Sequence, residues 1–121
     1  MTECKFHVQE NYKNCKFCRK WRQTYRYFKK KRRSNLNLYC VKLLHYRTHE
    51  WFWKLGLTSQ TLEKRFDETM ERFHVTVEWE VSLPMKQAVT KETNLLYYYQ
   101  VLQGRKYIPK ARLKGYTECI K

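Results

Sequence analysis

The chain has 121 residues, and its 26 Lys or Arg residues against 11 Asp or Glu residues give it a formal net charge of +15. Hydrophobic residues make up 42% of it, with three Gly and two Pro, which excludes a disordered chain, a flexible linker and a collagen-like protein. No run approaches the roughly 18 apolar residues that span a membrane, and no apolar secretion signal follows Met1, so we expect one small, basic, cytoplasmic protein that does not bind membranes.

Two pairs of metal-binding residue types lie near the N-terminus. Cys4 and His7 are separated by two residues, and so are Cys15 and Cys18. Three thiolates and one imidazole at this spacing fit a tetrahedral structural Zn²⁺ site. The alternative is that the four residues are unrelated and lie in a frayed terminus. An odd count of five cysteines without an export signal also favours reduced thiols or metal ligands over disulfides.

The first 35 residues are the most basic part of the chain, with twelve Lys or Arg and two acids. Trp21, Tyr25 and Phe28 recur at helical spacing, which predicts a short helix with an aromatic stripe that either packs on the protein or stacks on bases. Clustered cations repel one another unless a polyanion lies against them, so we interpret residues 1–35 as a nucleic-acid-binding arm. Its candidate phosphate-binding residues are Arg19, Lys20, Arg22, Arg26, Lys29, Lys30, Lys31, Arg32 and Arg33.

After this arm the composition changes to that of a sheet. Residues 36–44 and 51–57 are predicted strands, and residues 45–50 are the hairpin loop between them. Apolar residues at helical spacing then predict a helix of about three turns, from an N-cap at Thr58 or Ser59 to Phe73.

The second half of the chain adds one more strand and one more helix. Alternating apolar and polar residues predict a half-buried strand over residues 75–81. Pro84 suits the first position of a helix that continues to Tyr99, and residues 104–121 form a basic, irregular tail. The order β-β-α-β-α indicates an α+β domain over residues 36–121, with a three-stranded antiparallel sheet flanked by helices.

Glu92 interrupts the apolar face of the second predicted helix. An ionised carboxylate in that position must be hydrated, paired or bound to a cation, because burying it bare costs several kcal/mol. It either reaches water or a Lys at the edge of the apolar face, or points into a cleft where it holds a divalent metal such as Mg²⁺. Arg65 projects beside the apolar face of the first predicted helix in the same way.

Four short segments carry a resemblance to a known family. They are Leu38-Tyr39, Lys54-Leu55-Gly56-Leu57-Thr58, Glu63-Lys64-Arg65-Phe66 and Gly115-Tyr116-Thr117-Glu118-Cys119. With these segments, residues 36–121 resemble the GIY-YIG nucleases, in particular compact bacteriophage-type members whose second motif reads Lys-Ile-Gly. The resemblance implies a small GIY-YIG-like domain and a phage-encoded, divalent-metal-dependent DNA endonuclease that acts in the host-cell cytoplasm.

The resemblance also implies which residues act. Tyr39 matches the Tyr of the first motif, whose Gly is replaced by Asn37, and Lys54 stands where the second motif has its Tyr. Tyr39 would be the general base toward water, with Lys54 favouring its phenolate form. Arg65 would bind the non-bridging phosphate oxygens, and Glu92 would hold one Mg²⁺ or Mn²⁺ ion.

The same charge also fits a second class of protein. A non-catalytic basic nucleic-acid-binding protein, such as a phage regulator or a ribosome-associated factor, would use the basic arm and the zinc site without cutting DNA. The oligomeric state stays open, because cutting both strands would need two active sites, hence a dimer or two successive nicks.

Overall fold

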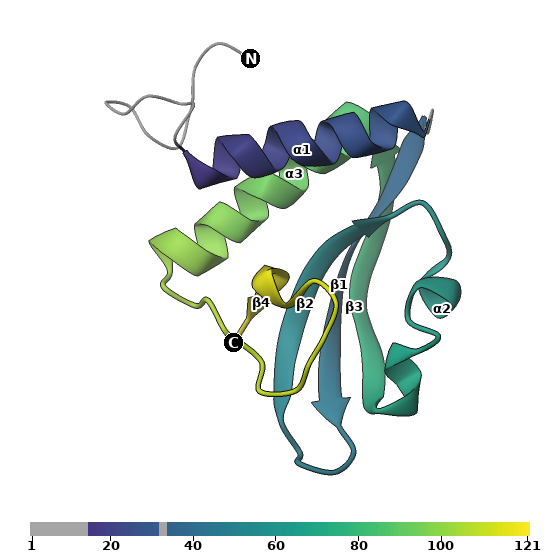
Figure 1. Ribbon diagram of the computed structural model, residues 1–121, viewed down its shortest axis with the longest axis vertical. Helices are drawn as coiled ribbons and strands as arrows, with labels where there is room; N and C mark the ends of the chain where they lie inside the picture. The colour runs from purple at the N-terminus through teal and green to yellow at the C-terminus, as the bar shows by residue number, and fades with distance from the viewer. Residues whose placement is uncertain (1–14, 32–33) are drawn as a thin grey trace.

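The computed structural model describes residues 15–31 and 34–121 as a mixed α+β structure with one antiparallel sheet of four strands in the order β3-β1-β2-β4. Helices α1 and α3 lie together across the upper part of the sheet, and the C-terminal segment returns to β2 (Figure 1). The elements are α1 (Lys16–Lys30), β1 (Asn35–His45), β2 (Trp51–Thr58), α2 (Leu62–Arg65), η2 (Thr69–Glu71), β3 (Phe73–Pro84), α3 (Met85–Tyr97), η3 (Tyr98–Leu102), η4 (Tyr116–Glu118) and β4 (Cys119–Ile120).

The hairpin of β1 and β2 forms where the sequence predicts it, and its register pairs Tyr39 with Gly56 and Val41 with Lys54. β1 is a central strand and is buried on both faces. On one face Cys40 packs in a cluster with residues of α1 and α3, and on the other Val41 packs in a cluster with Phe66. A continuous apolar run is what a strand covered on both faces requires.

The prediction of a three-turn helix after this hairpin is wrong, because the helix begins later and is shorter. The α-helix spans Leu62–Arg65 alone, and its N-cap is Thr61, whose Oγ1 accepts a hydrogen bond from the Lys64 N–H at 3.3 Å. Phe73 is already the first residue of β3 and pairs with His45. Leu62, Phe66 and Phe73 are buried as the helical spacing predicts, but Met70 is 41% exposed. After Phe66 the chain continues through turns and η2, and sheet pairing takes over at Phe73.

The third predicted strand is present at the edge of the sheet, and of its four alternating apolar side chains Val75 is half-buried while the other three are exposed. Val77, Trp79 and Val81 are 47%, 39% and 39% exposed. A bulge explains the difference, because Cys40 pairs with Trp79 while the next residue, Val41, pairs with Val77. The extra residue puts Val77 on the opposite face of the sheet from Trp79 and Val81.

The prediction of a three-stranded sheet is wrong, because the sheet has a fourth strand. This strand, β4, lies in the C-terminal tail that the sequence predicts to be irregular. Cys119–Ile120 pairs antiparallel with Trp53 and Lys54 of β2. A two-residue strand has no periodicity that a sequence pattern can detect. Its pairing with β2 brings the residues just before it against Lys54.

Helix α1 packs on α3 and shares its core. The indole N–H of Trp21 donates a hydrogen bond to the Thr90 hydroxyl at 2.9 Å, and the Trp21 ring stacks on Tyr25 with centroids 5.1 Å apart. Of the two interpretations of the aromatic stripe, the structure supports packing on the protein. Across residues 15–31 and 34–121, no helix has both the length and the apolar character needed to cross a membrane.

Candidate active site

Tyr39 and Lys54 meet on neighbouring strands of the sheet. The Lys54 ammonium donates a hydrogen bond to the Tyr39 hydroxyl at 3.1 Å, and the two residues are 0% and 1% exposed. Gly56 pairs with Tyr39 across the two strands, and its lack of a side chain leaves room for the tyrosine ring. A Cβ at Gly56 would lie 2.6 Å from Tyr39 Cζ and closer still to its hydroxyl oxygen, so a larger residue would displace the phenol ring.

Glu118 reaches Lys54 from the C-terminal segment. Its Oε1 lies 3.9 Å from the Lys54 Nζ. The turn that places it begins at Gly115, where φ is +77° and a Cβ would lie 2.9 Å from Lys54 Cε. Both the left-handed backbone and the close approach require glycine at this position. The tail therefore closes directly over the buried lysine.

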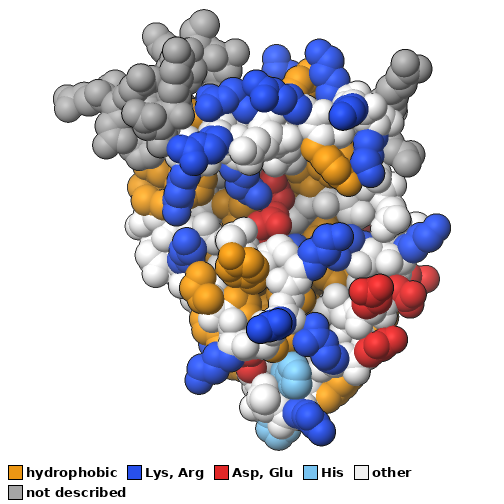
Figure 2. Space-filling model, viewed as in Figure 1, with side chains coloured by type: hydrophobic (Ala, Val, Ile, Leu, Met, Phe, Trp, Pro, Cys, Tyr) orange, Lys and Arg blue, Asp and Glu red, His pale blue; other side chains and the backbone are white. Residues whose placement is uncertain are grey.

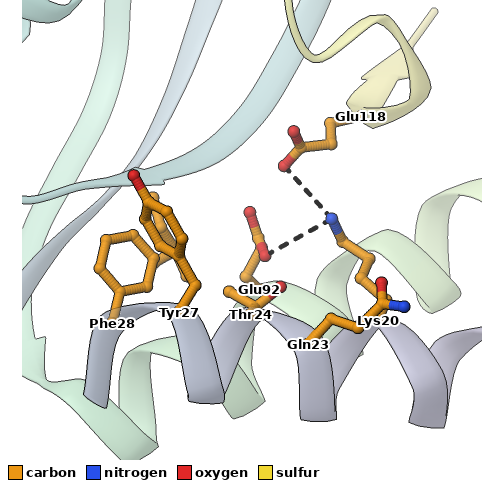
Figure 3. Close-up of a pocket in the computed structure, with 8 residues that line it drawn as sticks. Lys20, Gln23, Thr24, Tyr27, Phe28, Glu92 and Glu118 are labelled. Atoms are coloured by element: carbon orange, nitrogen blue, oxygen red, sulfur yellow. Dashed lines mark ion pairs between the residues drawn. The ribbon is translucent and has the colours of Figure 1, made fainter. Parts of the chain in front are cut away.

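Glu92 projects from α3 to the other side of Glu118. It is 2% exposed and lines the same surface pocket as Glu118. Lys20 of α1 joins the pair, with its Nζ 4.0 Å from Glu92 Oε1 and 3.6 Å from Glu118 Oε2 (Figure 3). A chain of polar contacts therefore runs from Tyr39 through Lys54 and the two carboxylates to Lys20.

The charged groups along this series of contacts shift one another's pKa values. Burial raises the pKa of Glu92 well above its ordinary value, and the Glu118 carboxylate adds to the rise. Burial would also raise the pKa of Glu118, but Lys54, the hydrogen bond with Glu92 and Lys20 together lower it. The two carboxyl groups therefore differ in proton affinity, with Glu92 the one that holds a proton more tightly. Burial alone would lower the pKa of Lys54, but Glu118 and Tyr39 raise it, so the lysine stays charged.

A surface pocket of about 290 Å³ opens beside the two carboxylates. It is lined mostly by one face of α1, and Figure 2 shows acidic atoms in a hollow beneath the Lys and Arg side chains that gather over this helix. The lining residues are Lys20, Gln23, Thr24, Tyr27, Phe28, Leu57, Glu92 and Glu118.

Arg65 lies at the end of α2, on the side of the site where Tyr39 and Lys54 meet. It is the last residue of α2, its guanidinium lies 5.2 Å from the centroid of the Phe66 ring, and its charge is close enough to lower the pKa of Lys54. Phe66 in turn meets the edge of the Tyr39 ring, with centroids 5.2 Å apart. Arg65 is therefore placed next to the Tyr39–Lys54 pair and contacts neither Glu92 nor Glu118.

The basic residues proposed to bind phosphate divide into three groups. Lys20 points into the site, while Arg22 is half-buried. Arg32 and Arg33 lie outside the described residues. The remaining five are exposed along α1 and at its C-terminal end, and they are Arg19, Arg26, Lys29, Lys30 and Lys31.

The predicted zinc site stays a prediction. Cys4 and His7 lie outside the described residues, whereas Cys15 and Cys18 are buried at the start of α1. Among the side chains that the structure describes, no three His, Cys, Asp or Glu residues gather closely enough to hold a metal ion. A pair of carboxylates such as Glu92 and Glu118 nevertheless suits Mg²⁺ or Mn²⁺, which is commonly bound by one or two carboxylates, several waters and substrate phosphates.

Sequence reasoning left Glu118 without a catalytic or binding role. The available signal was charge, because Glu118 is the one acid among residues 104–121, which contain six Lys or Arg. Comparisons of the chain with protein-family models, with curated proteins and with solved structures find no match. The functional argument therefore depends on this geometry and on the motifs of the sequence.

Proposed function

We propose that the protein is a divalent-metal-dependent DNA endonuclease that hydrolyses phosphodiester bonds with an active site of the GIY-YIG type. The observation that carries the proposal is the contact of the Lys54 ammonium with the Tyr39 hydroxyl, linked through Glu118 to Glu92. Tyr39, Lys54 and Glu92 come from three separate elements and match three positions of the family motifs. A basic helix, α1, lines the pocket beside them.

The side chains have the chemistry that the reaction needs. Tyr39 accepts a proton from the attacking water, and the Lys54 ammonium, which donates a hydrogen bond to the same phenol oxygen, holds that oxygen in position. The water oxygen bonds to phosphorus as the bond to the 3′ oxygen breaks, and the 3′ oxygen takes a proton from solvent, which leaves a 5′ phosphate and a 3′ hydroxyl. Arg65 binds the non-bridging oxygens. Glu92 would hold a divalent metal ion, which would supply charge neutralisation for the leaving oxygen.

The burial of Tyr39 sets a requirement on this reaction. Its hydroxyl is covered in the structure, so water and a phosphate reach it only when the side chains over it move. The turn at residues 115–118 and the side chain of Lys20 are the parts of the site nearest to solvent. DNA binding beside α1 would displace them first.

A plasmid-nicking assay tests the proposal. We expect nicking of supercoiled plasmid in Mg²⁺, its loss in EDTA, and a rate about 10²–10⁴ lower in Glu92→Gln, because one charged catalytic group is removed. Glu71→Gln is the matched control, since Glu71 is exposed and lies in η2, outside the residues that form the site, and it should cut like the wild type. The circular dichroism of all variants must match that of the wild type.

Two results contradict the nuclease proposal. Nicking that persists in both EDTA and Glu92→Gln comes from a contaminant. A folded wild-type protein that binds DNA and leaves it intact is the non-catalytic nucleic-acid-binding protein that the charge also fits.

A further inference from the structure

We propose that Glu92 and Glu118 together form a two-carboxylate site for one divalent cation, and that the Lys20 ammonium occupies this site in the metal-free protein. The inference deepens the proposed function, on which it rests, by naming a second ligand and the group that the metal replaces. It assigns a role to Glu118 of the C-terminal tail and to Lys20 of the basic helix α1.

The first argument is the position of the two carboxylates. Both line the same pocket although they come from α3 and η4, and Glu92 is 2% exposed. Two carboxyl groups held this close in a buried place repel each other unless a proton or a cation lies between them. The pocket of about 290 Å³ opens on this pair, so a hydrated ion has access to both.

The second argument is the position of Lys20. Its Nζ lies 4.0 Å from Glu92 and 3.6 Å from Glu118, so one cationic group already bridges the pair (Figure 3). The side chain of Lys20 is 31% exposed, and its flexible stem is free to swing toward solvent when another cation enters. Lys54, by contrast, is 1% exposed and held by the Tyr39 hydroxyl, so it stays in place.

The ligand set favours a particular class of ion. Carboxylate oxygens with room for several waters select Mg²⁺ or Mn²⁺, while thiolates and imidazoles select Zn²⁺. The N-terminal cysteines, which are the candidate zinc ligands, therefore do not compete for the probe.

Mn²⁺ titration of the full chain without DNA tests this inference. We expect one bound Mn²⁺ per chain by electron paramagnetic resonance, and an affinity at least about tenfold lower in Glu92→Gln and in Glu118→Gln, because each loses one ligand. Lys20→Met and Lys20→Gln should bind Mn²⁺ about tenfold more tightly, since no ammonium has to leave.

Two matched controls separate ligation from a general change in charge. Glu71→Gln removes an exposed carboxylate, and Lys91→Met removes an exposed cation next to Glu92 in sequence. Both should bind Mn²⁺ like the wild type. Glu118→Asp, which keeps a shorter carboxylate, should restore part of the affinity that Glu118→Gln loses.

The outcomes also distinguish this inference from the nuclease proposal. Wild-type affinity in Glu118→Gln excludes Glu118 as a ligand, and unchanged affinity in both Lys20 variants excludes the replacement of Lys20 by metal. Either result overturns the inference even if the protein nicks DNA. Mn²⁺ binding with the expected pattern, together with intact plasmid, supports the metal site and overturns the nuclease proposal.

Discussion

The ammonium group of Lys54 connects the two halves of the candidate site. It hydrogen-bonds the Tyr39 hydroxyl on one side and lies 3.9 Å from the Glu118 carboxylate on the other. A buried lysine that lost either partner would be left as an incompletely compensated charge, which is costly. Gly56 and Gly115 leave the space in which this lysine lies.

Gly56→Ala tests that close fit. The added methyl group would collide with the Tyr39 ring, so we expect a loss of about 1–3 kcal/mol in the free energy of unfolding and a nicking rate at least about 10² lower. Urea unfolding and the plasmid assay measure the two effects. A Gly56→Ala protein that cuts at the wild-type rate would show that the position of the Tyr39 hydroxyl does not matter for activity.

At the scale of the elements, one carboxylate fastens the C-terminal segment to the β1–β2 hairpin. Glu50 accepts hydrogen bonds from the Lys110 N–H at 2.8 Å, from the Ala111 N–H at 3.2 Å and from the Tyr107 hydroxyl. Burial alone would raise the pKa of Glu50, but these hydrogen bonds lower it below its ordinary value, and the same contact raises the pKa of Tyr107 to about 12. This segment leads to η4, which carries Glu118.

Glu50→Gln should therefore destabilise the fold in a pH-dependent way. Because the pKa of Glu50 is lower in the folded state, its contribution is complete above the ordinary carboxyl range near about 4.3 and is lost as the pH falls through the folded-state value. We expect the wild type to exceed Glu50→Gln by about 1 kcal/mol near neutral pH, with the gap closing in acid.

Thermal unfolding of both proteins across this pH range measures the gap. The pocket around Glu50 also contains His45, His49, Arg72, Lys110 and Lys121. All five are present in both proteins, so the difference between the proteins isolates Glu50. A gap that stays constant down to acid pH would contradict a role for the charge of Glu50.

At the scale of the whole molecule, the charge is arranged by helix α1. Its exposed cations lie over the hollow that contains the acidic pair, while Lys20 points inward to that pair (Figure 2). Cations that neutralise DNA phosphates release counterions, and each contact contributes about 0.9 to the slope of log affinity against log salt.

Single substitutions on α1 separate the two kinds of cation. With EDTA present to prevent cleavage, Arg26→Ala and Lys30→Ala should each reduce the magnitude of the salt slope by about 0.9. Lys20→Ala should leave it unchanged, because the charge of Lys20 is already balanced by carboxylates. Fluorescence anisotropy with duplex DNA measures the slopes, and an equal decrease for Lys20→Ala would place Lys20 on a phosphate instead.

The local sequence pattern was sufficient to predict those elements whose buried side is set by residues close together in the chain. The β1–β2 hairpin, the helix that carries Glu92 and the basic helix all form in the regions expected of them. Periodicity succeeds here because it reports which side of a single element is apolar. The departure of Glu92 from its apolar face was visible for the same reason.

Tertiary structure alone decided the features that depend on a distant partner. A bulge at Glu78 moved Val77 to the other face of β3, and pairing with His45 took Phe73 into the sheet. Pairing with β2 made Cys119–Ile120 a fourth strand. The meeting of Lys20 with Glu118 has the same origin, since the two residues are separated by most of the chain. Such pairs are set by the packing of whole elements against one another, which leaves no periodic trace in the sequence.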